Sequence, residues 1–209
     1  MSHLVLLTGL MGTGKSTVAR MLKEKGFIVL DTDTLMKSLY TVKPVKQLVN
    51  ALFGPRAFIE WPEQVPDVEK RRVDLEFIKG VFFDKGYINE STRLEFDMMQ
   101  MFYRMFRLHD DTHPNDIIFV EAAPTRLIYD FIHHYKIKQA VNVVCDENIR
   151  IARLLNRGMR MKDIELRKTR QKPFMITDCY TVINNGDEKE LSAAVSNLVE
   201  QVKQDYNIV

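Results

Sequence analysis

The chain has 209 residues, enough for one α/β domain that carries an inserted subdomain. Its 30 basic and 28 acidic residues are scattered and leave a net charge of +2, so no charged tail indicates nucleic acid or an anionic membrane as partner. Cys145 and Cys179 show neither metal-ligand spacing nor a disulfide framework, and no apolar run reaches membrane-spanning length. We therefore expect a cytoplasmic, uncleaved protein, a monomer or small homo-oligomer, with small-molecule partners.

The first predicted elements form a βαβ unit. Residues 4–7 are a short apolar run, which predicts a strand buried on both faces. A helix is expected from about Gly14, because the apolar residues that follow recur at helical spacing. Residues 27–30 predict a second buried strand that ends at Asp31. Such a unit has a right-handed crossover, so its two strands should be parallel.

A helical insertion is expected next. Residues 34–109 contain no convincing strand, and their apolar stretches have helical spacing. Residues 109–115 predict a polar loop that leads back to the sheet. Three more buried strands are predicted at residues 117–120, 140–144 and 181–183. Helices are expected at residues 127–134, 147–157, 162–172 and 188–206. The order of elements predicts a five-stranded parallel sheet covered on both faces.

Residues 9–16 carry the most specific motif. Their sequence, Gly-Leu-Met-Gly-Thr-Gly-Lys-Ser, fits the pattern G-x-x-x-x-G-K-[ST] and lies between a predicted strand and a predicted helix. The glycines let backbone N–H groups surround phosphate oxygens, and the helix adds its positive N-terminal end. We expect Lys15 to bridge the β- and γ-phosphates of ATP and Ser16 to be a ligand of Mg²⁺. The residues assigned to the nucleotide here are Gly12, Thr13, Gly14, Lys15, Ser16 and Thr17.

Carboxylates follow two of the predicted strands, at the edge where open α/β sheets bind ligands. Asp33 is the candidate general base for the attacking group, and Asp31 would orient it or hold metal-bound water. The alternative is that Thr32 or Asp33 caps a helix that begins near Leu35. Glu121 would hold magnesium through water, or else cap a helix or be an ordinary carboxylate at a strand end.

A group of arginines lies in the predicted lid at residues 150–172. Its members are Arg150, Arg153, Arg157 and Arg160. The spacing places the first three on one helical face, where planar guanidinium groups can close over phosphates during transfer. We assign Arg153 and Arg157 to nucleotide binding, and Arg157 also to catalysis. The alternative is a solvated face that pairs with Glu147 and Asp163.

These segments resemble the dephospho-coenzyme A kinase family of P-loop kinases. Residues 8–19 are similar to its opening stretch, and residues 29–33 to its D-x-D segment. Further similar segments are residues 74–84 and 93–95, in the family's helical substrate region, residues 154–158 in its lid, and residues 182–187 in its closing strand and turn. The resemblance implies a P-loop NTPase fold with a three-layer α/β/α architecture. It also implies ATP-dependent phosphorylation of a ribose 3′-hydroxyl, with Asp33 as base and Arg157 as lid arginine.

The chain departs from this family in segments that contact the acceptor. Residues 93–99 lack the family's His-Pro, and residues 121–126 keep only an acid and a proline of its D-x-P-L-L-[FY]-E segment. Two alternatives therefore stay open. A nucleoside or deoxynucleoside monophosphate kinase would use the same loop but needs no base, since its nucleophile is a phosphate. A P-loop switch protein would hydrolyse the nucleotide to control a partner. In each case residues 1–209 would form one domain.

Overall fold

The computed structural model describes residues 3–82, 85–112, 116–176 and 179–207. The chain divides into two compact units, which we call the sheet unit (residues 1–32 and 113–209) and the helical unit (residues 33–112). The helical unit thus interrupts the sheet unit directly after its second strand. Among the described residues, no helix is both long and apolar enough to cross a membrane.

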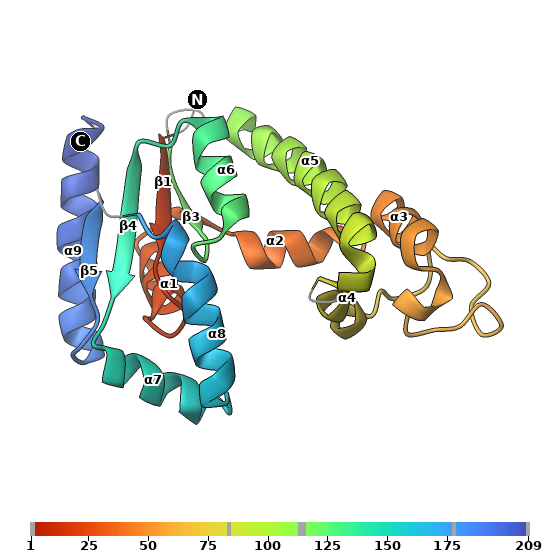
Figure 1. Cartoon of the computed structure of the whole chain (residues 1–209). Helices are drawn as coiled ribbons and strands as arrows, with labels where there is room; N and C mark the ends of the chain where they lie inside the picture. Colours follow the sequence, from red (N-terminus) through yellow and green to blue (C-terminus); the bar gives the residue numbers. More distant parts are fainter. Residues whose placement is uncertain (1–2, 83–84, 113–115, 177–178, 208–209) are drawn as a thin grey trace. The chain divides into compact units, whose positions relative to one another are not determined.

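The sheet unit is built on five parallel strands (Figure 1). They are β1 (His3–Thr8), β2 (Ile28–Asp31), β3 (Ile117–Glu121), β4 (Gln139–Val144) and β5 (Tyr180–Ile183). Their order is β2-β3-β1-β4-β5, with β1 in the centre. All five strands coincide with predicted runs, because strands buried on both faces are continuous apolar segments. The carboxyl ends of β1, β2 and β3 meet at one edge of the sheet.

Helices cover both faces of this sheet (Figure 1). On one face lie α1 (Lys15–Glu24) and α9 (Glu188–Asp205), and on the other lies α6 (Arg126–Tyr135). The helices α7 (Glu147–Asn156) and α8 (Met161–Gln171) follow β4 in the chain. Successive side chains of a strand point to opposite faces. Accordingly, Val5 and Leu7 pack with α1 and α9, whereas Leu6 packs with Ile128 of α6. The predicted three-layer α/β/α architecture is confirmed.

The helical unit contains the remaining helices. They are α2 (Thr32–Leu39, whose first residue belongs to the sheet unit), α3 (Lys43–Phe53), α4 (Leu75–Val81), α5 (Ile88–Thr112) and two short 3₁₀ helices, Pro55–Ala57 and Lys85–Tyr87. Its described residues include no strand, only an isolated antiparallel bridge between Phe58 and Val73. Val45 and Val49 of α3 and Leu94 and Met98 of α5 are buried in its core.

One predicted loop is wrong over part of its length. Residues 109–112 continue α5 instead of starting a polar loop, and residues 113–115 of that loop lie outside the described residues. Once a buried stripe has nucleated a helix, each added residue gains a backbone hydrogen bond, so polar residues can extend it. Within the segment compared with the family's substrate region, residues 83–84 also lie outside the described part.

Candidate active site

The phosphate-binding loop connects β1 to α1. Gly14 precedes α1 with a backbone φ of 101°, a conformation that side chains other than glycine rarely adopt. A Cβ at this position would lie 2.0 Å from the side-chain nitrogen of Asn184. Thr13 is buried, and its hydroxyl donates to the Leu10 carbonyl at 2.9 Å. The loop is therefore held in one shape by internal bonds and by close packing.

Replacing Gly14 by alanine is expected to destabilise the fold by about 3 kcal/mol, since the new methyl group is strained and displaces the buried Asn184 side chain. Gly26→Ala is the matched control, because Gly26 has a φ of 88° but nothing lies near its missing Cβ. That variant should lose only about 1 kcal/mol. Urea unfolding compares the two variants, and equal losses would contradict the steric argument.

Lys15 lies against the phosphate-binding loop. Its ammonium group donates to the Gly9 carbonyl at 2.8 Å and to the Leu10 carbonyl at 3.3 Å. Lys15 is the first residue of α1, so the positive end of the helix lies directly beside it. The loop thus presents an ammonium group, backbone N–H groups and a helix N-terminus together, which suits a polyphosphate.

Three oxygen-bearing side chains meet at the sheet edge beside this loop. Ser16 donates its hydroxyl to Glu121 Oε1 at 2.8 Å, although 105 residues separate them in the chain. Asp31 is the in-register neighbour of Glu121 in the β2–β3 pairing. Burial raises the pKa of the Glu121 carboxyl above its ordinary value, the Ser16 hydroxyl opposes this, and the negative charge of Asp31 adds to it.

This oxygen set fits Mg²⁺. Magnesium is bound through oxygen atoms, typically by one or two carboxylates together with waters and phosphate oxygens. Ser16, Glu121 and Asp31 supply such oxygens, and the described residues hold no cluster of three or more His, Cys, Asp or Glu that would form an all-protein cage. A cation there would also offset the unfavourable proximity of the two carboxylates.

Two of the predicted arginines reach the phosphate-binding loop from α7. Arg150 is 1% exposed, and its guanidinium donates to the Met11 carbonyl at 3.2 Å. Arg153 donates to the Thr13 carbonyl at 3.5 Å. Both bonds are to backbone carbonyls, so these two arginines shape the loop in this structure.

Among the described residues, the other two arginines make no side-chain hydrogen bond to the loop. The helix α7 ends at Asn156, so Arg157 is its exposed C-cap residue and does not continue the helical face. No side-chain hydrogen bond or ion pair joins Arg157 to another residue in the described part of the chain. Arg160 forms an ion pair with Asp163 at 2.8 Å, as the solvated alternative predicts. Of the two, Arg157 is therefore the one available to a ligand.

The helix α8 contributes residues that the sequence did not single out. Gln171 Oε1 accepts a hydrogen bond from the Met11 N–H at 3.0 Å, and a guanidinium nitrogen of Arg167 lies 3.8 Å from the Met11 sulfur. Residues four apart share a helical face, so the spacing of Arg167 and Gln171 was the signal that could have identified them. α7 and α8 thus bind the backbone of Met11 at its carbonyl and its N–H, respectively.

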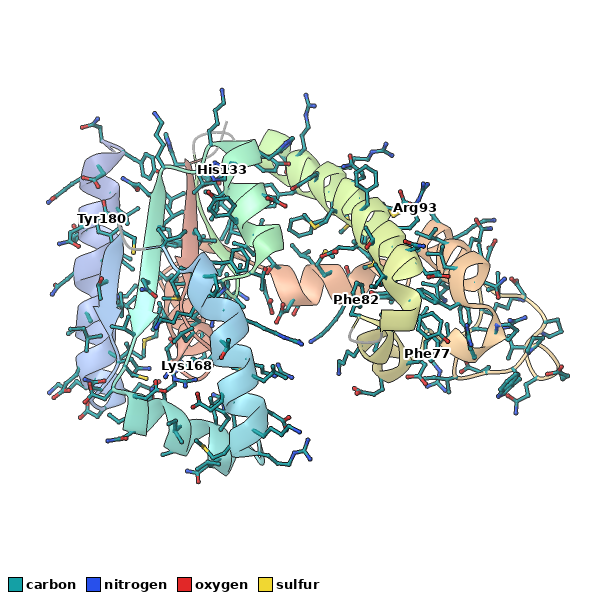
Figure 2. The ribbon with its side chains drawn as sticks, viewed as in Figure 1. Phe77, Phe82, Arg93, His133, Lys168 and Tyr180 are labelled. Carbon is teal, nitrogen blue, oxygen red and sulfur yellow. The ribbon has the colours of Figure 1, made fainter. Side chains whose placement is uncertain are left out.

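Glu147 joins these two helices. Its carboxylate accepts two hydrogen bonds from Arg150, both of 2.8 Å, and one of 2.8 Å from Lys168, which extends from α8 (Figure 2). The hydrogen bonds from Arg150 have the largest effect on the pKa of Glu147, and together with the bond from Lys168 they lower it from 4.5 to about 2. Burial acts in the opposite direction and raises this pKa.

A depressed carboxyl pKa stabilises the fold above the unfolded-state pKa, and this contribution is lost as the pH falls from about 4.5 to about 2. Glu147→Gln should therefore lose roughly 1 kcal/mol at neutral pH, a small value because solvent screens the 42% exposed side chain, and nothing near pH 2. Urea unfolding at several pH values measures the difference. Glu200→Gln, an exposed change on α9, is the control; equal pH profiles for the two variants would argue against the ion pairs.

The candidate base lies in the first turn of α2. This helix begins at Thr32, three residues before the predicted start, so Asp33 lies inside it and does not precede it as an N-cap residue. A carboxylate in a first turn is favoured by the helix dipole. Only Thr32 separates Asp33 from β2, and the Thr32 hydroxyl donates to the Glu121 carbonyl at 3.0 Å.

Comparisons with known proteins agree with this architecture. A family model described as an AAA domain matches residues 5–174. The chain is 27% identical to a dephospho-CoA kinase from Aquifex aeolicus over 95% of this chain and 97% of that protein. A solved structure of a Thermus thermophilus protein has a TM-score of 0.73 at 20% identity, and covers 95% of this chain and 97% of its own. The solved dephospho-CoA kinase from Campylobacter jejuni has a TM-score of 0.62 at 12% identity, covering 98% and 99%.

Proposed function

This chain belongs to the AAA domain family and is an ATP-dependent kinase, and we propose that its acceptor is the ribose 3′-hydroxyl of dephospho-coenzyme A. The observation that carries the choice of acceptor is the similarity to a dephospho-CoA kinase over nearly the full length of both chains. The D-x-D segment Asp31-Thr32-Asp33 supports it, because a hydroxyl acceptor requires a base whereas a phosphate acceptor does not.

In the proposed reaction the acceptor oxygen attacks the γ-phosphorus of ATP, the bond from that phosphorus to the β–γ bridging oxygen breaks, and ADP leaves. Asp33 takes the proton of the acceptor hydroxyl. Lys15 and the backbone N–H groups of the loop stabilise the negative charge that develops on the phosphate oxygens. Ser16 and Glu121 would hold Mg²⁺, which neutralises phosphate charge when bound.

The helical unit and the lid would bind the acceptor and cover the phosphates. Residues 33–112, close to the predicted insertion at 34–109, would bind the acceptor, and residues 150–172 would form the lid. Arg157, exposed at the end of α7, would close over the phosphates. The reaction needs only small-molecule partners, and a cytoplasmic location would supply both substrates.

The decisive experiment is an acceptor screen. ADP release is measured with ATP and Mg²⁺ alone, and then with dephospho-coenzyme A or with each nucleoside and deoxynucleoside monophosphate. We expect stimulation by dephospho-coenzyme A, with a product heavier by one phosphoryl group in mass spectrometry. Stimulation by a monophosphate instead would assign the chain to the alternative kinase class, and ADP release that no acceptor stimulates would favour the switch protein.

A further inference from the structure

The turn after β5 reaches back to the phosphate-binding loop. Asn184 is only 6% exposed, and its backbone N–H donates to the Val144 carbonyl at 2.8 Å, which extends the β4–β5 pairing by one residue. Its side-chain amide donates to the Thr13 carbonyl at 2.8 Å across 171 residues of sequence. A buried amide with this bond is a fixed part of the structure, since leaving the carbonyl unpaired would cost about 1 to 3 kcal/mol.

A second side chain converges on the same carbonyl. Arg153 of α7 lies 3.5 Å from the Thr13 oxygen through one guanidinium nitrogen and 3.4 Å from Asn184 Oδ1 through the other. Gly14, next in the chain, leaves just enough space for the amide, because a Cβ there would lie 2.0 Å from its nitrogen. Asn184, Arg153 and Gly14 therefore form a closely fitted support under the Thr13 carbonyl.

The planar peptide bond connects this support to the phosphate side of the loop. In a trans peptide the carbonyl of one residue and the N–H of the next point in opposite directions. Since the Thr13 carbonyl points at Asn184, the Gly14 N–H points away from Asn184. Backbone N–H groups at this place in the motif are the ones that receive phosphate oxygens. Rotation of the Thr13–Gly14 peptide would turn one of these donors away from the ligand.

We propose that Asn184 is a positioning residue for nucleotide binding, which fixes the Thr13–Gly14 peptide so that its N–H faces the phosphates. The inference rests on the proposed function only as far as ATP binding, and it is independent of the acceptor. Asn184 acts through the loop and does not itself contact the nucleotide.

The neighbouring residue offers a matched control. Asn185 lies in the same turn and also makes one donated and one accepted side-chain hydrogen bond, to Asp146 Oδ1 at 2.9 Å and from the Asp146 N–H at 2.7 Å. Both of its bonds go to the loop before α7, and neither goes to the phosphate-binding loop. Asn185→Ala therefore removes the same kind of contact without freeing the Thr13 carbonyl.

The test measures ADP affinity by calorimetry and the melting temperature of each ligand-free variant. Asn184→Ala should weaken ADP binding about tenfold, equivalent to about 1.4 kcal/mol, whereas Asn185→Ala should change it less than about twofold. The KM for ATP should rise in the same proportion as the ADP dissociation constant. A residue that served stability alone would lower the melting temperature and leave the ADP affinity of the folded protein unchanged.

Asn184→Asp keeps the inference testable if the alanine variant does not fold. The carboxylate has the same size and can still accept from Arg153, but it cannot donate to the Thr13 carbonyl, so ADP affinity should fall as in Asn184→Ala. Wild-type ADP affinity in Asn184→Asp, or equal losses in Asn184→Ala and Asn185→Ala, would overturn the inference. Because ADP binding needs no acceptor, a failed acceptor screen would leave this result intact.

Discussion

Lys15→Met is expected to lower kcat/KM for ATP about 10³-fold, the scale seen when a pre-positioned group that stabilises transition-state charge is removed. The methionine side chain has similar length but carries no charge, so the β- and γ-phosphates lose their bridging cation. In the structure the ammonium donates to the Gly9 and Leu10 carbonyls, which places it at the loop. Steady-state kinetics with the best acceptor measures the loss.

Lys25→Met is the control for this prediction. Lys25 follows α1 and donates to the Ser196 hydroxyl at 2.9 Å, at the other end of the helix from the loop. Its replacement should leave kcat/KM within about twofold, since exposed polar contacts of this kind contribute little. If Lys15→Met retained wild-type kcat/KM, the assignment of residues 9–16 to the phosphates would be wrong.

Asp33→Asn is expected to lower kcat about 10³-fold with the hydroxyl acceptor, within the range that general base catalysis contributes. The amide is the same size as the carboxylate but cannot take the proton. ADP affinity should not change, because the phosphate-binding loop is untouched. Single-turnover kinetics, combined with calorimetry of ADP binding, separates the chemical step from nucleotide binding.

Asp67→Asn provides the comparison within the helical unit. Asp67 is an exposed loop residue whose carboxylate accepts from the Glu69 N–H. An amide oxygen can accept the same bond, so this variant should keep wild-type turnover. If Asp33→Asn behaved like Asp67→Asn, the chain would not need a base, and a phosphate acceptor would become the better explanation.

The sheet could be predicted from sequence because its signal is local. Each strand is a continuous apolar run, and a parallel sheet buried on both faces requires such runs. The helix α3 was not predicted individually, since its three buried residues, Val45, Val49 and Phe53, lie in a short segment that begins beside Pro44. The end of α5 was misplaced because polar residues continue a helix whose apolar part is already anchored.

The sequence indicated the position of a residue at the sheet edge where that residue belongs to a local motif or ends a predicted parallel strand. Gly14, Lys15 and Ser16 belong to one local motif, and Glu121 could be placed at the same edge because it ends a parallel strand. For other contacts the sequence indicates at most a shared helical face, as for Arg167 and Gln171, and not what that face contacts. The bond from the Met11 N–H to Gln171 spans 160 residues and depends on how α8 packs against the loop.

The roles of the arginines show the same limit. Their spacing indicated a common face on α7, but not what that face would meet. Arg150 is buried and bonded to a loop carbonyl, whereas Arg157 lies just beyond the helix and is exposed. The packing around an arginine decides whether its guanidinium bonds to the protein backbone or is exposed to a ligand. The spacing of arginines in the sequence does not show which of the two applies.

The bond between Asn184 and the Thr13 carbonyl also bears on how the protein is made. The turn that supports the phosphate-binding loop is synthesised well after it, since 171 residues separate Asn184 from Thr13. Contacts between residues so far apart in sequence form late in folding, because closing a long loop costs conformational entropy before the contact contributes any stabilisation. A nascent chain on the ribosome therefore carries the complete motif long before the loop is supported. We expect tight ATP binding only once this contact between Asn184 and Thr13 has formed.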